Sequence, residues 1–387
     1  MNLKATFPLV LALAYLYLYA PHEARAQVAP SPLLGPDLHS QTVFSKTYTS
    51  TGANSQVFGN VLSGGASTTG ANASVHGDLV SAGAATTGGG GSTVSGNIVS
   101  GGVLTTGDSS IVGGGITSSG ASTVGANSRI GGSIVSGGAS TTGKSSTVNG
   151  DIWSGGVVSI GATGTVVGAV AATGSISVPA GSTVGSQQSL SSSPIDATAS
   201  TTAISTTVTS DAQQVMAAQS ALKKMGAGTA LATTITTNLT LNSGVYSAAN
   251  LSTSAGTTLY LDGQGLDDQY WVFNITDILA TGASTNIVLV NSGLNSSVIW
   301  NTGGYASLGA NSIFVGTILA NDYISVGAHA QVSGVGNSCV GLYSASSYVS
   351  IGDTSFVRGD GCSCESNGDN FDIDPSGTAY YVNSSNN

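Results

Sequence analysis

An alternation of apolar and polar residues surrounds a glycine that returns every 18 residues, once after 19, at positions 59, 77, 96, 114, 132, 150 and 168. Apolar residues lie two positions before and two positions after each of these glycines. They are Val57, Val75, Val94, Val112, Ile130, Val148 and Val166 before it, and Val61, Leu79, Ile98, Ile116, Ile134, Ile152 and Val170 after it. Because successive side chains of a strand point to opposite faces, this pattern predicts two short strands that meet at a bend and share an apolar side.

Two more glycine columns have the same period, at 52, 70, 88, 107, 125, 143 and 161 and at 65, 83, 102, 120, 138, 156 and 174. Three glycine-marked corners per repeat predict a triangular coil of three strands, and we expect glycine to supply backbone angles that a Cβ forbids. Stacked coils pair their strands in parallel about 4.8 Å apart. The alternative, a barrel or sandwich, does not require identical residues at one fixed period. The predicted fold is therefore all-β dominated, a three-faced parallel β-solenoid over residues 49–185 that follows an N-terminal segment, 27–48.

Helical spacing replaces this pattern after residues 186–208, a Ser/Thr/Ala-rich stretch that we expect to be a linker. One apolar stripe consists of Val215, Met216, Leu222 and Met225. Thr209 or Ser210 can cap a helix, and Gly226 can end it. The pattern predicts a helix over residues 209–226 that lies flat against the solenoid, with its methionines in the core.

Strand-like alternation returns after the helix. Gly309 and Gly316, Gly327 and Gly334, and Gly352 and Gly359 repeat the seven-residue glycine spacing of the first half. The same type of coil is therefore expected over residues 227–338, followed by a Cys-containing acidic tail over 339–387.

The composition is that of a folded chain with few charges: 56 glycines, 40% hydrophobic residues and 7% charged residues. Disorder goes with low hydrophobicity and high charge. Beyond residue 26 the basic residues are Lys46, Arg129, Lys144, Lys223, Lys224 and Arg358. So few cations exclude nucleic-acid binding. Six acidic residues fall between Asp353 and Asp374, a grouping typical of a solvated tail.

Residues 1–26 have the order of a secretory signal peptide: Lys4, an apolar run from Phe7 to Tyr19, and Ala24-Arg25-Ala26. The apolar run is shorter than the roughly 20 residues that a membrane-spanning helix needs. We expect cleavage near Gln27 and a secreted, extracellular protein with no membrane span after cleavage.

Three cysteines lie near the C-terminus, and secretion permits a disulfide between Cys339 and either Cys362 or Cys364. The histidines are scattered along the chain, at positions 22, 39, 76 and 329. We therefore expect no metal site and no cofactor.

The stretch from the helix through Gly334 resembles the ice-binding-like family, also called DUF3494. The resemblance is carried, in the family's order and spacing, by Leu241-Asn242-Ser243-Gly244-Val245-Tyr246, Leu259-Tyr260-Leu261-Asp262-Gly263-Gln264-Gly265, Trp271-Val272-Phe273-Asn274-Ile275, Val298-Ile299-Trp300 and Phe314-Val315-Gly316-Thr317-Ile318-Leu319-Ala320. It implies a right-handed three-faced solenoid with one long flanking helix, C-terminal coils that join N-terminal ones, and adsorption to ice. The sequence departs from the family in its seven regular N-terminal coils and in its tail.

Adsorption to ice needs a rigid, evenly spaced surface of hydroxyl and methyl groups, and two neighbouring columns are candidates. The first holds Ser50, Thr68, Thr86, Thr105, Thr123, Thr141, Ser159 and Ser177, and the second holds Thr51, Thr69, Thr87, Thr106, Val124, Thr142 and Ile160. Strand alternation places the two columns on opposite faces. We favour the all-hydroxyl column as the exposed one.

A Thr-Gly-x-Asn motif, which ice binders of this family often show, favours the second column instead. It occurs at Thr51-Gly52-Ala53-Asn54 and Thr69-Gly70-Ala71-Asn72. The predicted ice contacts are therefore Thr51, Asn54, Thr68, Thr69, Asn72, Thr86, Thr87, Thr105, Thr106, Thr123, Thr141 and Thr142. The plain alternative is that these are ordinary strand threonines, since β-branched residues are common in strands.

Two other functions are compatible with a repetitive β-solenoid: catalysis and a structural or adhesive role. An enzyme is disfavoured because Glu365 is the one glutamate after the signal, the aspartates do not cluster within the repeats, and no serine lies in a Gly-x-Ser-x-Gly motif. A structural or adhesive extracellular solenoid is the stronger rival. Asn-x-Ser/Thr sequons begin at Asn72, Asn238, Asn250, Asn274, Asn295 and Asn383, and a glycan on Asn72 would obstruct an ice-facing surface there. We expect a monomer whose partner is the ice surface.

Overall fold

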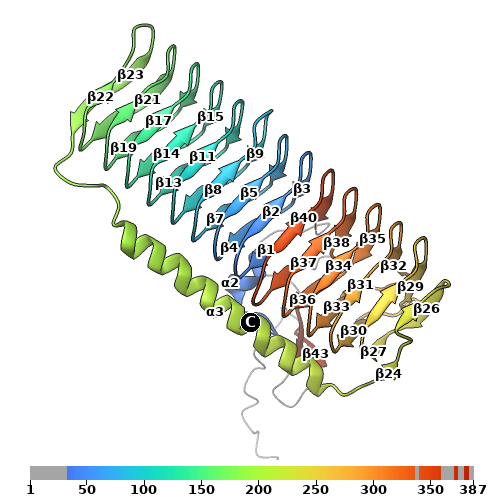
Figure 1. Cartoon of the computed structure of the whole chain (residues 1–387). Coiled ribbons are helices and arrows are strands. Elements are labelled where there is room, and N and C mark those ends of the chain that lie inside the picture. The colour runs from blue at the N-terminus through green and yellow to red at the C-terminus, as the bar shows by residue number, and fades with distance from the viewer. Residues whose placement is uncertain (1–32, 336–339, 359–369, 374–378, 383–387) are drawn as a thin grey trace, which may run out of the picture.

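The computed structural model describes residues 33–335, 340–358, 370–373 and 379–382. They form a long rod of stacked coils with one long helix along its side (Figure 1). Every strand pairing within the rod is parallel, and the one antiparallel pair joins β42 (Asn370–Ile373) and β43 (Ala379–Val382) outside it. The predicted fold class, a mostly β solenoid with one long flanking helix, is confirmed.

Each regular coil contributes one strand to each of three stacks. The first stack is a separate 14-stranded sheet: β22 (Ile176–Ser177), β20 (Val158–Ser159), β17 (Ser140–Thr142), β14 (Ser122–Val124), β11 (Leu104–Thr106), β8 (Ala85–Thr87), β5 (Ser67–Thr69), β2 (Thr49–Thr51), β40 (Val349–Ile351), β37 (Ile324–Val326), β34 (Ala306–Leu308), β31 (Leu279–Ala280), β28 (Leu251–Thr253) and β25 (Thr234–Ile235).

The other two stacks join into one 27-stranded sheet, because the long strands β21 (Thr165–Ala172) and β23 (Thr183–Ser189) run through both. The helix-side stack continues with β19 (Ile152–Ser154), β16 (Ile134–Ser136), β13 (Ile116–Ser118), β10 (Ile98–Ser100), β7 (Leu79–Ser81), β4 (Asn60–Ser63), β1 (Gln41–Ser45), β39 (Leu342–Ser344), β36 (Thr317–Ala320), β33 (Ser297–Thr302), β30 (Tyr270–Ile275), β27 (Gly244–Ala248) and β24 (Thr229–Ala230). The third stack continues with β18 (Thr147–Val148), β15 (Arg129–Ile130), β12 (Ile111–Val112), β9 (Thr93–Val94), β6 (Ser74–Val75), β3 (Gln56–Val57), β41 (Phe356–Arg358), β38 (Gln331–Ser333), β35 (Ile313–Val315), β32 (Asn286–Val290), β29 (Thr258–Asp262) and β26 (Leu239–Asn242).

The two halves of the chain meet in the middle of the rod, at a contact that we call the joint. There the coil of residues 41–58 stacks on the coil of residues 342–358 through the pairs β1–β39, β2–β40 and β3–β41. The Phe58 amide, for example, donates to the Val357 carbonyl at 2.8 Å. The rod therefore runs from β24 to β41 and then, across the joint, from β1 to β23.

The helix α3 (Ala197–Lys224) returns the chain from one end of the rod to the other. Its predicted start at 209 is wrong: Asp196 caps the helix by accepting from the Ala199 amide at 3.0 Å, so the expected linker is largely helical. Threonines are frequent in this first part, and several of their hydroxyls donate to the carbonyl four residues earlier. Gly226, with φ 90°, ends the helix as predicted. Neither α3 nor the short α2 (Pro36–His39), the helices of the described residues, is long and apolar enough to cross a membrane.

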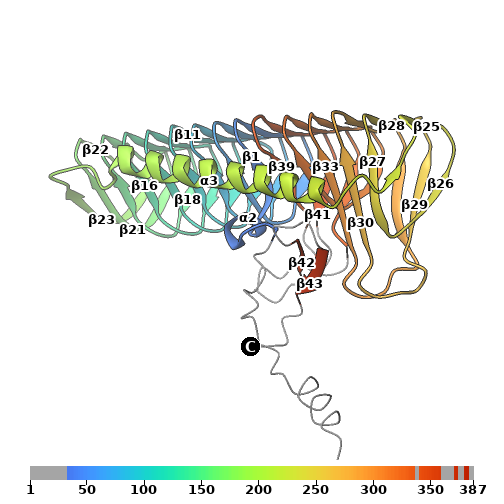
Figure 2. The same ribbon diagram turned by 90° about the horizontal axis from the view of Figure 1, so that it is seen from below.

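The buried side of α3 covers the helix-side stack along much of the rod (Figure 2). The stripe runs through Ile204, Val208, Val215 and Leu222, which pack on Phe44, Leu62, Leu319 and Tyr343 of the stack. Met216, which we predicted to be in the core, is 45% exposed, because it lies about 100° around the helix from Val215. This stack is therefore not a free surface.

Inside the rod, the predicted apolar columns are buried as expected, from Val57 to Val166 and from Val61 to Val170. The role that we predicted for the glycines is wrong for nearly all members of the three repeat columns, in which Gly59, at φ 122°, is the one glycine with a positive φ. In the column that begins at Gly52, no glycine has a positive φ, and the left-handed corner residues are instead Asn54 and Asn72, at φ 56° and 55°. Glycine is needed for close approach, since a Cβ on Gly70 would lie 2.5 Å from the amide nitrogen of Ala53 in the preceding coil.

The coil boundaries also extend beyond the predicted ones. In the first half β23 ends at Ser189 and not at 185, and in the second half a further complete coil, β39 to β41, occupies residues expected to begin the tail. The predicted signal peptide and the three cysteines lie outside the described residues.

Candidate functional site

The outward side of the 14-stranded sheet carries the all-hydroxyl column. Its strands alternate between buried outer positions and an accessible middle position, and Thr68, Thr86, Thr123 and Thr141 are exposed there. Thr105 is half-buried in the same register. The prediction that this column faces outward is confirmed.

The column continues across the joint into the second half of the chain. Ser50 pairs with Ser350, which pairs with Ser325, and Ser325 pairs with Ser307. We call the whole column the hydroxyl ladder: Ser177, Ser159, Thr141, Thr123, Thr105, Thr86, Thr68, Ser50, Ser350, Ser325, Ser307, Ser252 and Thr234, with Ala280 as its interruption. The sequence analysis did not include the members that follow residue 177 in the sequence: Thr234, Ser252, Ser307, Ser325 and Ser350. Their signal was present, because Ser307 and Ser325 stand two residues before Gly309 and Gly327 just as Ser159 stands before Gly161.

The threonine hydroxyls of the ladder are available to water. Among the described residues, those of Thr68, Thr86, Thr105, Thr123 and Thr141 make no hydrogen bond. Near the joint and at the far end the ladder bonds to itself. The Ser50 hydroxyl donates to that of Ser350 at 3.1 Å, and the hydroxyls of Thr234 and Ser252 are 2.9 Å apart.

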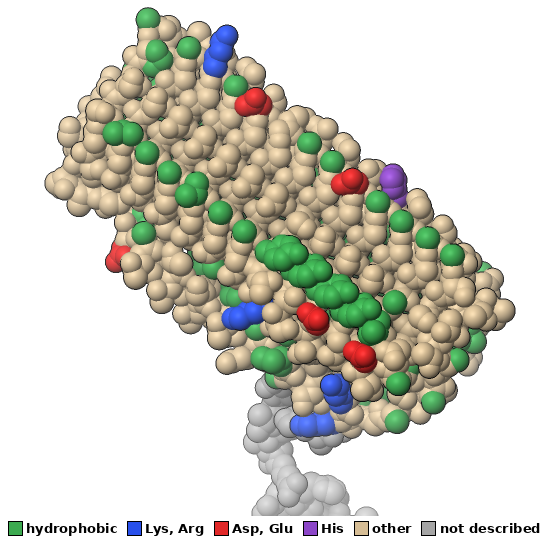
Figure 3. Space-filling model, viewed as in Figure 1, with side chains coloured by type: hydrophobic (Ala, Val, Ile, Leu, Met, Phe, Trp, Pro, Cys, Tyr) green, Lys and Arg blue, Asp and Glu red, His purple; other side chains and the backbone are tan. Residues whose placement is uncertain are grey.

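A second outward column, two residues before the ladder, divides this face into two parts. In the first half of the chain it is small and apolar: Ala66, Ala84, Val103, Ala121, Ala139 and Val157. At the joint and beyond it consists of four stacked rings, the tyrosine stack: Tyr48, Tyr348, Tyr323 and Tyr305, with ring centroids 4.6, 5.0 and 4.6 Å apart. Figure 3 shows a row of large hydrophobic side chains across the middle of this side of the rod.

The tyrosine stack changes the exposure of the ladder beside it. Ser350, Ser325 and Ser307, next to the rings, are half-buried, whereas most of the ladder's threonines are exposed. We call the part of this face without tyrosine rings the threonine panel. It consists of Thr68, Thr86, Thr105, Thr123 and Thr141 with Ala66, Ala84, Val103, Ala121 and Ala139 beside them.

Five of the predicted ice contacts point into the rod, so these predictions are wrong: Thr51, Thr69, Thr87, Thr106 and Thr142 are all buried. The reason is strand alternation, which turns each of them away from its exposed neighbour. Inside, the hydroxyls of Thr69, Thr106 and Thr142 accept from glycine amides of the next coil at 3.2–3.3 Å.

Asn54 and Asn72 are exposed, but at a corner outside the ladder. Both have left-handed backbones, which asparagine tolerates better than most residues. The Asn72 side-chain amide donates to the Asn54 amide oxygen at 3.3 Å. The left-handed backbone at this corner thus explains the asparagine of the Thr-Gly-x-Asn motif, and no contact of the asparagine with ice is needed to explain it.

The hydroxyl ladder and the tyrosine stack contain no Asp, Glu, Lys, Arg or His side chain, and the nearby charge is Asp322, which acts on the phenols of Tyr323 and Tyr348. Burial, followed by the neighbouring ring Tyr305, raises the pKa of Tyr323, and burial also raises the pKa of Tyr348. These phenols therefore stay protonated at and well above neutral pH. Within the described part of the chain, no group of three or more His, Cys, Asp or Glu side chains could hold a metal ion.

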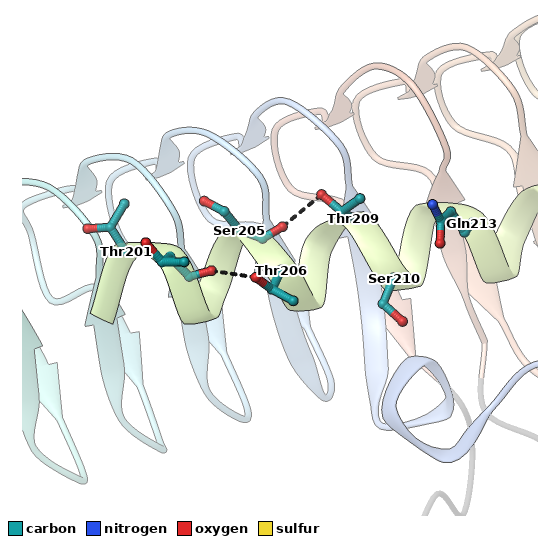
Figure 4. A pocket seen from close by; sticks show the side chains of 7 residues that line it. Thr201, Ser205, Thr206, Thr209, Ser210 and Gln213 are labelled. Carbon is teal, nitrogen blue, oxygen red and sulfur yellow. Dashed lines mark hydrogen bonds between the residues drawn. The ribbon is translucent and has the colours of Figure 1, made fainter. Parts of the chain in front are cut away.

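A shallow groove on α3 is the other surface with many hydroxyls (Figure 4). It is lined by Thr201, Thr202, Ser205, Thr206, Thr209, Ser210 and Gln213. The Thr206 hydroxyl donates to the Thr202 carbonyl at 2.9 Å, and that of Thr209 donates to the Ser205 carbonyl at 2.8 Å. These donors already serve the helix, so the groove offers a weaker site than the ladder.

Comparison with known proteins shows that part of this chain is similar to one family. The family model described as Ice-binding-like matches residues 156–338, so most of the N-terminal repeats precede the matched range. Ice-binding protein 1 of Shewanella frigidimarina (strain NCIMB 400) is 38% identical over 99 residues, which are 25% of this chain and 11% of that protein.

Two solved structures are similar to larger parts of the chain. The crystal structure of an ice-binding protein from the Antarctic ascomycete Antarctomyces psychrotrophicus is 23% identical, with a TM-score of 0.33 over 62% of this chain and 93% of that one. The DUF3494 domain of the Shewanella frigidimarina protein is 20% identical, with a TM-score of 0.33 over 58% of this chain and 92% of that domain.

Proposed function

We propose that this protein adsorbs to ice through its hydroxyl ladder and inhibits crystal growth and recrystallisation, since residues 156–338 match the model of the ice-binding-like family. The observation that carries the proposal is the ladder itself, in which every strand of a 14-stranded sheet except β31 presents one outward hydroxyl. Parallel strands repeat about every 4.8 Å, so the hydroxyls form an evenly spaced row. In keeping with the sequence of the first 26 residues, the protein is secreted.

We place the main ice contact on the threonine panel. A threonine side chain offers a methyl and a hydroxyl group, and branching at Cβ restricts its rotamers, so little side-chain freedom is lost on adsorption. The four alanines and Val103 beside these threonines add apolar surface with short side chains, whereas the tyrosine rings stand beside the half-buried serines of the second half. The whole panel, within residues 66–141, precedes residues 156–338, which match the family model.

The panel's chemistry suits a neutral solid better than a charged or soluble ligand. It carries no ionisable side chain, and its apolar and hydroxyl groups are offered over several coils and not gathered in a cleft. We accordingly propose that the protein is not an enzyme.

A structural or adhesive extracellular role without ice activity is the second candidate function. The regular coils that precede residue 156 favour it, because a rod of this kind can also act as a spacer.

Ice-affinity partitioning of matched variants separates the two candidates. Thr86→Tyr places a ring on the panel, and Thr93→Tyr places the same ring on the third stack of the same coil. We expect wild type and Thr93→Tyr to enter the ice fraction and Thr86→Tyr to remain largely in the liquid, because one protruding ring holds the neighbouring threonines off a flat lattice. If wild type itself stays in the liquid, the adhesive role replaces ice binding.

A further inference from the structure

Both ends of the rod leave core residues partly uncovered. At one end is the finishing coil, residues 173–189, in which Ile176, Val178 and Val184 are only half-buried although they pack on the core. In the neighbouring coil, Val158, the partner of Ile176, is 1% exposed. Among the described residues, no further coil stacks on the finishing coil to complete its burial.

The opposite end is similar. The starting coil, residues 229–242, holds Leu231 and Leu239, which are also half-buried against the core. Its strands β24, β25 and β26 each pair with one other strand, as β22 and β23 do at the finishing end. Each end thus presents apolar side chains framed by strand edges.

Neither end carries the charges that usually protect strand edges. No charged residue occurs between Asp151 and Asp196 around the finishing coil, or between Lys224 and Asp262 around the starting coil. Natural sheets commonly keep their edges apart with charged side chains or proline. Pro179 is the one such residue in the finishing coil.

The joint shows that two coil ends of this chain stack without a covalent connection between them. Residues about 300 positions apart are held by backbone bonds, such as Gly52 amide to Ile351 carbonyl at 2.7 Å and Thr354 amide to Ala53 carbonyl at 2.8 Å. At the joint, the last coil of the second half, residues 342–358, is followed by the first coil of the first half, residues 41–58. A coil that ends one half therefore stacks on a coil that begins the other. The two free ends of the rod have this same polarity relative to each other.

We propose that rods associate head to tail, the finishing coil 173–189 of one copy stacking on the starting coil 229–242 of a second copy. The half-buried Ile176, Val178 and Val184 then face Leu231, Ile235 and Leu239. Ser177 is placed beside Thr234, so the hydroxyl ladder continues from one rod to the next. Since the two surfaces differ, the contact does not close on itself and further copies can add. The protein is monomeric in dilute solution and associates as its concentration rises.

Sedimentation at temperatures above freezing tests this association independently of ice binding. Val178→Lys blocks the finishing end, Leu231→Lys blocks the starting end, and Val157→Lys, on the side of the rod, is the matched control. We expect the average mass of wild type and of Val157→Lys to rise with concentration and each end variant alone to stay monomeric. An equimolar mixture of the two end variants should reach about twice the monomer mass, because one unblocked finishing end meets one unblocked starting end.

The mixture also serves as the folding control, since only folded coils can restore association. A constant wild-type mass over the series overturns the proposal. Association of either end variant with itself indicates a head-to-head contact and overturns the proposed polarity.

Discussion

The two halves of the rod are built from the same type of coil but differ in coil length and in the side chains of their cores. In the first half, paired strands of successive coils are almost always 18 residues apart, as for Leu104 and Ser122, and small aliphatic side chains fill the interior. In the second half, Leu251 and Leu279 are paired across 28 residues, and the interior holds a row of rings: Tyr246, Phe273, Trp300 and Phe314. Uniform small core residues permit uniform coils and hence an even outer face, whereas large rings require longer and less regular coils.

The aromatic row gives the second half its strongest packing, so its loss should have the largest effect. Trp300 is fully buried, stacks on Phe273 with ring centroids 3.8 Å apart, and donates its indole N–H to the Val315 carbonyl at 2.9 Å. We expect Trp300→Ala to lower the free energy of unfolding by about 3–5 kcal/mol. Chemical denaturation measures this change. Trp153→Ala, at a 41% exposed position of the first half, is the control and should change it by less than about 1 kcal/mol. Similar losses from both tryptophans would contradict the difference between the two interiors.

The close approach of coils in the first half predicts an intermediate effect. A Cβ on Gly125 would lie 2.4 Å from the carbonyl carbon of Gly107, whereas a Cβ on Gly89 meets nothing closer than 3.6 Å. Both glycines have ordinary negative φ, so backbone freedom does not distinguish them. We expect Gly125→Ala to destabilise the protein by about 1–3 kcal/mol through overpacking.

Thermal unfolding compares this variant with Gly89→Ala, which should behave like wild type. Equal destabilisation by both would mean that glycine acts through conformation and not through coil spacing.

The regular half was predictable from sequence because its information is local. The fixed period and the alternation of residues such as Val57 and Val61 define coils, inward columns and the outward threonine column without knowledge of distant contacts. The early start of α3 was missed because a threonine-rich segment has low helix propensity, and only the Asp196 cap and the packing of Ile204 and Val208 reveal it.

The features at the joint could not be read from local pattern. Ser50 and Ser350 become neighbours only once the last coil of the second half stacks on the first coil of the chain. The tyrosine stack likewise unites Tyr48 with Tyr305, Tyr323 and Tyr348, which stand far away in sequence. The glycine spacing gives each of these residues its place within a coil, but no local pattern reveals that the two halves stack on each other in register.

The smallest predicted effect compares the two parts of the hydroxyl ladder directly. Ser159→Thr adds a methyl group beside Val157 in the first half, and Ser325→Thr adds the same group beside Tyr323 in the second. A methyl group removed from water contributes about 0.8 kcal/mol, which corresponds to at most about a fourfold increase in ice partitioning. We expect Ser159→Thr to approach this increase and Ser325→Thr to leave partitioning unchanged, because the adjacent ring keeps ice away from the serine. Partitioning of the two variants at several protein concentrations measures the difference. An equal increase in both would extend the ice contact over the whole ladder and remove the distinction between the threonine panel and the region beside the tyrosine stack.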